Sequence, residues 1–442
     1  MSEMQAEKLE TEICRESSHG SIPLVIPRDR HPISRKMMDN EVLKVLYRLK
    51  TQGHLAYLCG GGVRDLMVGN KPKDFDVATD ARPGRLKKLF ANSWLVGKRF
   101  RIVHVVFKGG KTVEVSTFRR ESEFKETVGD SMMLCRDNTF GTPEADALRR
   151  DFTINALYYD VSDFTIIDYV GGMEDIRKRV IRCIGNPDIR FQEDPIRILR
   201  GIRFGANLDF QIEETTWDAM KAHANKILLC PASRIQEDLL RLMRKSGIEK
   251  GYRYLDETGV LAHILPELSV VRDGEGRLPD VFWRTLGAMD VCRGARNREL
   301  TDAVLWAGVF YWPLRKELEH LAPTADCSGA VHDLLNVPGV RLNIPKAVRN
   351  QVKRIVAGQY VLSAETEKPG LRKGWLKLFK SMALDEAFDL AWVLRHALGL
   401  SEEPLLDLRN EMESSAVGPP KRRSGHRSRR RSNRKKKITT AN

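Results

Sequence analysis

Two short runs decide the fold of this chain: Gly60-Gly61-Gly62-Val63-Arg64-Asp65 and Lys73-Asp74-Phe75-Asp76-Val77. The glycines predict a tight turn that opens into a short helix, and the second run predicts a strand. Side chains alternate along a strand, so we expect Asp74 and Asp76 to lie on the same face. Two carboxylates at such a short separation repel each other unless a cation lies between them. Oxygen ligands beside a glycine turn that phosphates can approach therefore predict Mg²⁺ and a nucleoside triphosphate.

An isolated Asp-x-Asp pair is at least as typical of a surface turn with two solvated acids as of a metal site, because short motifs have many false positives. Arg64 and a later run, Arg149-Arg150-Asp151, favour the phosphate site. That later run, taken alone, is more typical of an ion cluster on a helix surface. Glu114 lies in a predicted strand between valines, and it is either an edge residue or an extra carboxylate near the metals.

Size and composition narrow the class of protein. A chain of 442 residues is long enough for two or more domains. It has no run of about 18 apolar residues, so no membrane span is expected. Its first residues lack the basic-then-apolar pattern of a secretory signal. The seven cysteines form no Cys-x-x-Cys pair, which disfavours a zinc site and indicates reduced thiols in a cytoplasm.

Positive charge is concentrated in a C-terminal tail. Residues 421–437 hold eleven Lys or Arg and no acid, and removing these eleven from the net charge of +15 leaves +4. Such a composition cannot build a core, so we expect disorder and a salt-sensitive contact with nucleic acid phosphates. Anionic lipid binding and simple solubilisation stay open. The candidate RNA contacts are Arg422, Arg423, Arg429, Arg430, Arg431, Lys435 and Lys436.

Periodicity predicts an α+β chain, with a small mixed or antiparallel sheet first and helices almost to residue 410. We expect a mobile arm at 1–25, a head at 26–185, a helical neck at 186–245, a helical body at 246–413 and a disordered tail at 414–442. Helices are expected at 40–50, 83–90 and 145–156. Strands are expected at 55–58, 75–78, 102–107, 112–117 and 164–168. Residues 26–32 read as an extended connector and 122–142 as a flexible loop.

Five runs, in order, resemble the nucleotidyltransferase head of the bacterial tRNA-CCA-adding enzymes and poly(A) polymerases. They lie at residues 60–65, 74–76, 149–155, 168–172 and 193–197, and the resemblance covers about residues 26–240. It implies that Asp74 and Asp76 hold two Mg²⁺ ions, with Asp151 as a third catalytic acid. An RNA 3′-hydroxyl would attack the α-phosphate of the nucleotide and release pyrophosphate.

The same resemblance implies how the nucleotide is held. Asp194 would accept from an exocyclic amine of the base while Arg197 donates to ring positions, so that protein side chains replace a template. The alternative for this run is a basic helix face held by Glu193 and Asp194. The nucleotide-binding set implied by the resemblance is Gly61, Gly62, Arg64, Arg150, Asp194, Arg197, Arg200 and Arg203.

Residues 95–104, which include the basic run Gly97-Lys98-Arg99-Phe100-Arg101, resemble the poly(A) polymerase branch, as do residues 26–36 and 135–141. The resemblance implies template-independent polyadenylation of RNA 3′ ends from Mg²⁺-ATP, which marks RNA for decay and brings in decay machinery as a partner. A loosely specific basic tail suits an unstructured 3′ end. The alternatives are tRNA CCA addition and a catalytically inactive RNA-binding adaptor, the latter disfavoured by intact Asp74, Asp76 and Asp151.

Overall fold

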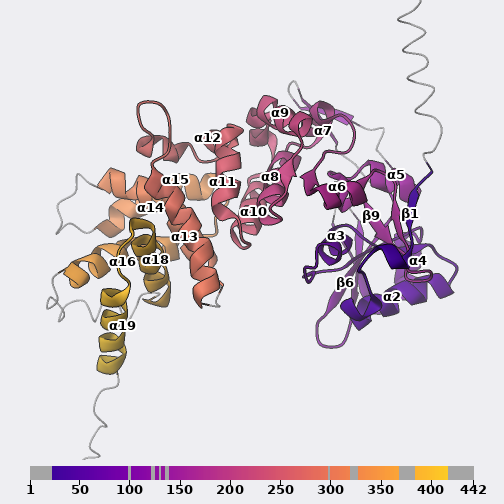
Figure 1. The fold of residues 1–442 in the computed structure, drawn as a ribbon, viewed down its shortest axis with the longest axis horizontal. Helices are drawn as coiled ribbons and strands as arrows, with labels where there is room; N and C mark the ends of the chain where they lie inside the picture. The colour runs from indigo at the N-terminus through magenta and orange to yellow at the C-terminus, as the bar shows by residue number, and fades with distance from the viewer. Residues whose placement is uncertain are drawn as a thin grey trace, which may run out of the picture.

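The computed structural model describes residues 22–97, 101–120, 125–128, 131–134, 139–296, 299–318, 327–367 and 384–416. Figure 1 shows an elongated molecule with the sheet-bearing head at one end, the helical body at the other, and α8 and α10 between them. The expectations for residues 1–21, 98–100, 135–138 and the basic tail lie outside the described residues. Among the helices of the described residues, none combines the length and the apolar composition that a membrane span requires.

The described part of the head is built on an eight-stranded mixed sheet with the order β1-β10-β9-β2-β3-β6-β5-β4. Neighbouring strands are antiparallel except β3 and β6, which are parallel. The strands are β1 Leu24–Ile26, β2 Ala56–Cys59, β3 Asp76–Thr79, β4 Ser93–Val96, β5 Ile102–Val106, β6 Thr112–Thr117, β9 Leu157–Tyr159 and β10 Ile166–Asp168. The predicted mixed sheet is therefore confirmed, with β4 and β1 at its two edges.

Two helices cover one face of this sheet. The predicted helix at 40–50 is α2 (Asn40–Thr51), and α4 spans Pro83–Leu89. Apolar residues recur in α2 at helical spacing, and all four, Val42, Val45, Leu46 and Leu49, are buried. They join a core that includes Val77 and Val115. The opposite sheet face carries Asp76 and Glu114, because successive strand side chains point to opposite faces.

Three local predictions were wrong. The end of the expected arm at 1–25 and the start of the expected connector at 26–32 form β1, which pairs with β10, and Arg28–Arg30 within the connector is a 3₁₀ turn. The expected loop at 122–142 contains a hairpin of β7 (Lys125–Val128) and β8 (Ser131–Leu134). The expected helix at 145–156 is instead α5 (Pro143–Leu148), a turn, and a 3₁₀ turn η3 at Thr153–Asn155. Asp151 explains that break, because its carboxylate accepts from the Phe152 backbone and the Asn155 side chain and so competes with helical bonds.

Helices dominate after β10, as predicted, apart from the short parallel pair β11 (Val180–Ile181) and β12 (Gln211–Ile212). The neck contains α8 (Ile196–Asn207), whose buried face packs on α10 (Ala232–Met243) and α11 (Ile248–Glu257). The other helices are α3 Gly61–Met67, α6 Gly172–Lys178, α7 Pro187–Glu193, α9 Glu214–Ala222, α12 Val260–Ile264, α13 Asp280–Arg296, α14 Asp302–Leu318, α15 Cys327–Arg341, α16 Lys346–Glu367, α18 Leu384–Leu398 and α19 Glu403–Ala416.

Candidate active site

One cavity of ≈ 1150 Å³ is lined by the glycine turn, by strands β3 and β6, by the turn at residues 149–151 and by helices α8 and α10. It gathers every site residue predicted in the head and neck. These are Gly61, Gly62, Arg64, Asp74, Asp76, Arg150, Asp151, Asp194, Arg197, Arg200 and Arg203. The predicted RNA contacts of the tail lie outside the described residues. Residues from runs more than 100 positions apart thus face one space.

The glycine turn follows directly from β2. Gly60 has φ +71° and ψ −139°, a backbone conformation that side chains disfavour, and α3 begins at Gly61. A Cβ added at Gly60 would lie 3.1 Å from Arg150 Nη1. One added at Gly62 would lie 3.4 Å from the Phe75 ring. The turn therefore packs tightly against its neighbours, and all three of its glycines line the cavity.

The two aspartates of the second run lie at the start of β3. Only Asp76 belongs to the strand, because β3 begins there, so the expectation of two aspartates within one strand needs correction for Asp74. Asp76 is in register with Glu114 on β6, which also lines the cavity. Glu114 lies 3.4 Å from His104 Nε2. The strand pairing therefore adds Glu114 as a third carboxylate beside Asp74 and Asp76. This placement favours the interpretation of Glu114 as an extra carboxylate near the proposed metal site over that of an edge residue.

Burial and neighbouring carboxylates disfavour the charged form of Asp76. Burial, then the Glu114 carboxylate, raises the pKa of Asp76 to about 6, and Asp74 adds to the effect while Arg150 opposes it. Among the described residues, no group of three or more His, Cys, Asp or Glu side chains is arranged to hold a metal ion. Mg²⁺ is commonly bound through one or two carboxylates together with substrate phosphates. Asp74 and Asp76 fit that mode of binding, in which the nucleotide completes the site.

Neutralising Asp76 is expected to stabilise the metal-free protein. Because folding raises the pKa of Asp76 from 3.8 to about 6, the charged form costs stability above pH 6 and the cost vanishes below about pH 4. Asp76→Asn should therefore raise the free energy of unfolding in EDTA at pH 8 by an amount on the order of 1–3 kcal/mol, which raises the temperature midpoint of unfolding by a few degrees. Calorimetry at pH 4 and pH 8 measures this, with Asp80→Asn as the control. An equal gain at both pH values would contradict it.

Arg64 lies behind the glycine turn and is buried. Its Nε and Nη2 donate to Asp65 Oδ1 at 2.9 and 2.6 Å, and Nη1 donates to Asn155 Oδ1 at 2.5 Å. The guanidinium also lies 4.9 Å from the centroid of the Phe204 ring. The structure thus places Arg64 in the cavity wall, with much of its donor fork already used to join α3 to η3 and α8.

The turn at residues 149–151 is organised by Asp146, which sequence reasoning missed. Arg149 and Arg150 both donate to its carboxylate, and so does the Tyr158 hydroxyl, at 2.8 Å. Burial alone would raise the pKa of Asp146, but the two guanidinium groups outweigh burial and hold that pKa well below its usual range. Arg150 also donates to the Asn155 carbonyl. Arg150 is therefore fixed at the edge of the cavity.

Asp151 lines the same cavity but pairs away from the metal-site carboxylates. Its Oδ2 accepts from Arg200 Nε at 2.6 Å. Burial would raise the pKa of Asp151, yet Arg200 and the hydrogen bond from Asn155 lower it below its usual range. The pair therefore joins the head turn to α8 across the cavity. Arg203 likewise donates to Asp238 of α10, at 2.9 Å.

The predicted base-reading residues meet at the junction of α7 and α8. Arg197 donates to the Arg190 carbonyl and to Glu193, so part of the alternative ion cluster is present. Asp194 does not pair with the basic residues of α8, as the alternative interpretation would require. Both of its oxygens instead accept from Arg234 of α10, at 2.8 and 3.0 Å. Such a fork-to-fork pair fixes the plane of the carboxylate.

Sequence reasoning also missed several residues on the far side of the cavity. Phe204 packs beneath three guanidinium groups, with Arg203 at 4.2 Å from the ring centroid. Arg234 has its partners only through tertiary contacts. The available signal was the helical spacing of basic residues along α10 and the turn that follows it. The same lining contains Arg234, Arg241, Arg244 and Lys245, together with Glu237, which accepts a hydrogen bond from Arg241.

Comparisons with the sequences of known proteins cover the head and much of the helical part of the chain. The poly A polymerase head domain matches residues 56–182, and the family described as "Probable RNA and SrmB- binding site of polymerase A" matches residues 209–271. Poly(A) polymerase I of Salmonella typhi is 39% identical over 380 residues, 83% of this chain and 80% of the relative. A CCA-adding enzyme of Bacillus pumilus is 36% identical over 54% of this chain and 57% of its own length.

Solved structures show the same architecture. The CCA-adding enzyme of Bacillus stearothermophilus in complex with CTP has a TM-score of 0.63 at 26% identity, covering 86% of this chain and 83% of the other. The Thermotoga maritima CCA-adding enzyme complexed with tRNA has a TM-score of 0.59 at 19% identity, covering 88% and 87%. At the latter identity the likeness concerns the fold alone.

Proposed function

Since this chain belongs to the tRNA nucleotidyltransferase/poly(A) polymerase family and is an RNA 3′-end nucleotidyltransferase, we propose that it adds adenylate residues to RNA from Mg²⁺-ATP without a template. The main support is the extent of similarity. The likeness to poly(A) polymerase I covers 83% of the chain, and the Bacillus pumilus CCA-adding enzyme aligns over 54%. The body as well as the head therefore resembles a polymerase.

The chemistry proposed is an in-line displacement. The RNA 3′-hydroxyl gives its proton to solvent, its oxygen attacks the α-phosphate of ATP, the bond from that phosphorus to the bridging oxygen breaks, and pyrophosphate carries the electron pair away. Asp74 and Asp76 would hold Mg²⁺, which lowers the pKa of the attacking hydroxyl and neutralises the triphosphate. The glycine turn would give the phosphates a close approach to backbone N–H groups, and Arg150, which packs beside Gly60, would add positive charge at the same place.

The base would be read at the junction of α7 and α8. The Asp194 carboxylate accepts from the amine at adenine N6, and Arg197 donates to a ring nitrogen. Arg234 is proposed as a positioning residue, because its paired bonds to Asp194 fix the direction in which the carboxylate lone pairs point. The arginines of α10 continue from this point and would accompany the phosphates of the RNA end.

A primer-extension assay tests the proposed function. An unstructured RNA and a tRNA that lacks its CCA end are each incubated with Mg²⁺ and with ATP, CTP or both. Long tails of adenylate on either RNA, with little use of CTP, are expected. Addition that stops after C, C and A on the tRNA would overturn the proposal.

CCA addition is the second candidate function, because the solved structures that resemble this chain include CCA-adding enzymes, one of them at 26% identity. It predicts that CTP and ATP are both used and that the product has a fixed length. Supplying ATP alone separates the two candidates, since a CCA-adding enzyme extends a tRNA lacking all three nucleotides only after CTP has been used.

The tail is proposed to anchor RNA and to make binding sensitive to salt. Removing residues 421–442 deletes eleven cations, so both the RNA affinity and the slope of log affinity against log salt concentration are expected to fall. Filter binding at several salt concentrations measures both. An unchanged slope after truncation would assign the tail to another role. So would a truncation that abolishes binding to anionic vesicles but leaves RNA binding unchanged. We also propose that the adenylate tails that the enzyme adds to RNA mark that RNA for decay in the cytoplasm.

A further inference from the structure

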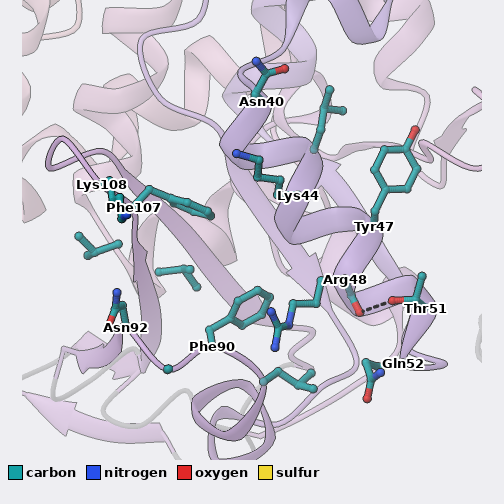
Figure 2. Close-up of a pocket in the computed structure, with 15 residues that line it drawn as sticks. Asn40, Lys44, Tyr47, Arg48, Thr51, Gln52, Phe90, Asn92, Phe107 and Lys108 are labelled. Atoms are coloured by element: carbon teal, nitrogen blue, oxygen red, sulfur yellow. Dashed lines mark hydrogen bonds between the residues drawn. The ribbon is translucent and has the colours of Figure 1, made fainter.

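A second hollow lies on the head, away from the catalytic cavity. This groove of ≈ 1080 Å³ runs between α2, the end of α4 and the end of β5. Its fifteen described lining residues include none that line the catalytic cavity. Figure 2 shows Lys44 and Arg48 projecting from α2 toward Phe107 and Phe90. The groove is thus a separate feature of the head surface.

Strand register places the groove and the catalytic carboxylates on opposite faces of the sheet. Val105 lines the groove and is in register with Val113 of β6. The next residue of β6, Glu114, points to the other face and lines the catalytic cavity. A molecule in the groove therefore stays clear of the nucleotide and of the RNA end.

The floor of the groove is apolar. Leu43 and Phe107 are only partly buried against the core, and both line the groove. Leu95 of the edge strand β4 is in register with Val103, on the same sheet face, and is 40% exposed. The same sheet face therefore has exposed apolar side chains both in the groove and at the free edge of the sheet. Exposed apolar surface in a groove is a feature of interaction sites in soluble proteins.

The rim of the groove is positively charged. It carries Lys44, Arg48 and Lys108, and none of the fifteen described lining residues is acidic. Within the described chain, the structure pairs none of these three cations with a carboxylate; Arg48 instead lies 5.5 Å from the centroid of the Phe90 ring. A matching occupant must therefore offer an apolar stripe flanked by negative charge.

We propose that the groove docks an acidic amphipathic helix of a partner protein and leaves the active site open. Helix-in-groove recognition requires an apolar trough with a complementary rim, and both are present. The wall formed by α2 has 12 residues, about 18 Å, which matches a partner helix of about three turns. Single-stranded RNA fits less well, because stacking needs open ring faces. Phe90 is buried beneath Arg48, which leaves only Tyr47 and Phe107 to stack bases.

Fluorescence anisotropy with the full chain tests the proposal. The probe is a labelled peptide of about 18 residues with leucines at positions i, i+3, i+4 and i+7 and glutamates flanking them. We expect Lys44→Glu combined with Arg48→Glu to weaken binding about tenfold or more. The matched control, Lys87→Glu with Lys88→Glu on the exposed side of α4, should bind the peptide as the unchanged chain does. Primer extension should be unaltered in all of these variants.

Four results would overturn the proposal. One is absence of peptide binding to the unchanged chain. A second is equal binding by the groove and control variants, and a third is equal binding of a scrambled peptide that lacks the apolar stripe. The fourth is a labelled unstructured RNA, or a second copy of the chain detected by sedimentation, whose binding is lost in the groove variant while peptide binding is not.

Discussion

Replacing Asp76 with alanine is expected to lower adenylate transfer by about 10³-fold or more while RNA affinity stays within about twofold. Asp76 faces the cavity beside Glu114, and burial together with neighbouring carboxylates disfavours its charged form. In the proposed mechanism, removing this carboxylate would take a ligand from the cation that neutralises the triphosphate, so the charge that develops on pyrophosphate would no longer be compensated. RNA binding is proposed to depend on other groups, namely the basic residues at α10 and the tail.

The matching experiment compares Asp74→Ala, Asp76→Ala and Asp80→Ala in single-turnover extension and in filter binding. Asp80 follows β3 directly but lies outside the cavity, where it contacts His54 at 3.1 Å, so its loss should leave the rate within about twofold. Raising the Mg²⁺ concentration should partly rescue the first two variants, because the lost ligand lowers metal affinity. Unchanged extension by Asp76→Ala would remove the carboxylate from the mechanism. Unchanged cellular function with no extension would favour an RNA-binding adaptor.

The elements that the sequence predicted well are those with local signals. The α2 helix follows from apolar spacing, and the glycine turn follows from a backbone that needs Gly60. Strand β1 was missed because it has three residues and its pairing with β10 is more than 100 positions away in the chain. The expected helix at 145–156 failed because the Asp151 side chain bonds locally to the backbone. The domain boundaries after residues 185 and 245 stay predictions.

For the site too, the sequence predicted some features and not others. Motif order predicted which residues face the cavity, and all those in the described chain line it. It did not predict how they are paired. Arg200 bonds Asp151, and Asp194 bonds Arg234, across helices that only the tertiary fold brings together. Reading Arg200 as a free nucleotide contact therefore omits its role in joining α8 to the head.

The pairing of Asp194 leads to the second large effect. Asp194→Asn is expected to reduce the preference for ATP over CTP by about 100-fold, mainly through a higher KM for ATP. An asparagine presents one acceptor and two donors where the carboxylate presents acceptors only, so the bond to the adenine amine and the paired bonds from Arg234 cannot both be kept. Competition assays with labelled ATP and CTP on one RNA measure the ratio directly.

Structural damage must be separated from base reading in this experiment. Arg234→Gln keeps the Asp194 carboxylate but removes the fork that orients it, so we expect an intermediate loss of preference. Because the two side chains act as a unit, the double variant should lose little more than Asp194→Asn alone. Asp256→Asn breaks another arginine pair, with Arg272 outside the cavity, and should leave the preference unchanged. Fully additive losses would mean that Arg234 acts on the nucleotide independently and does not position Asp194.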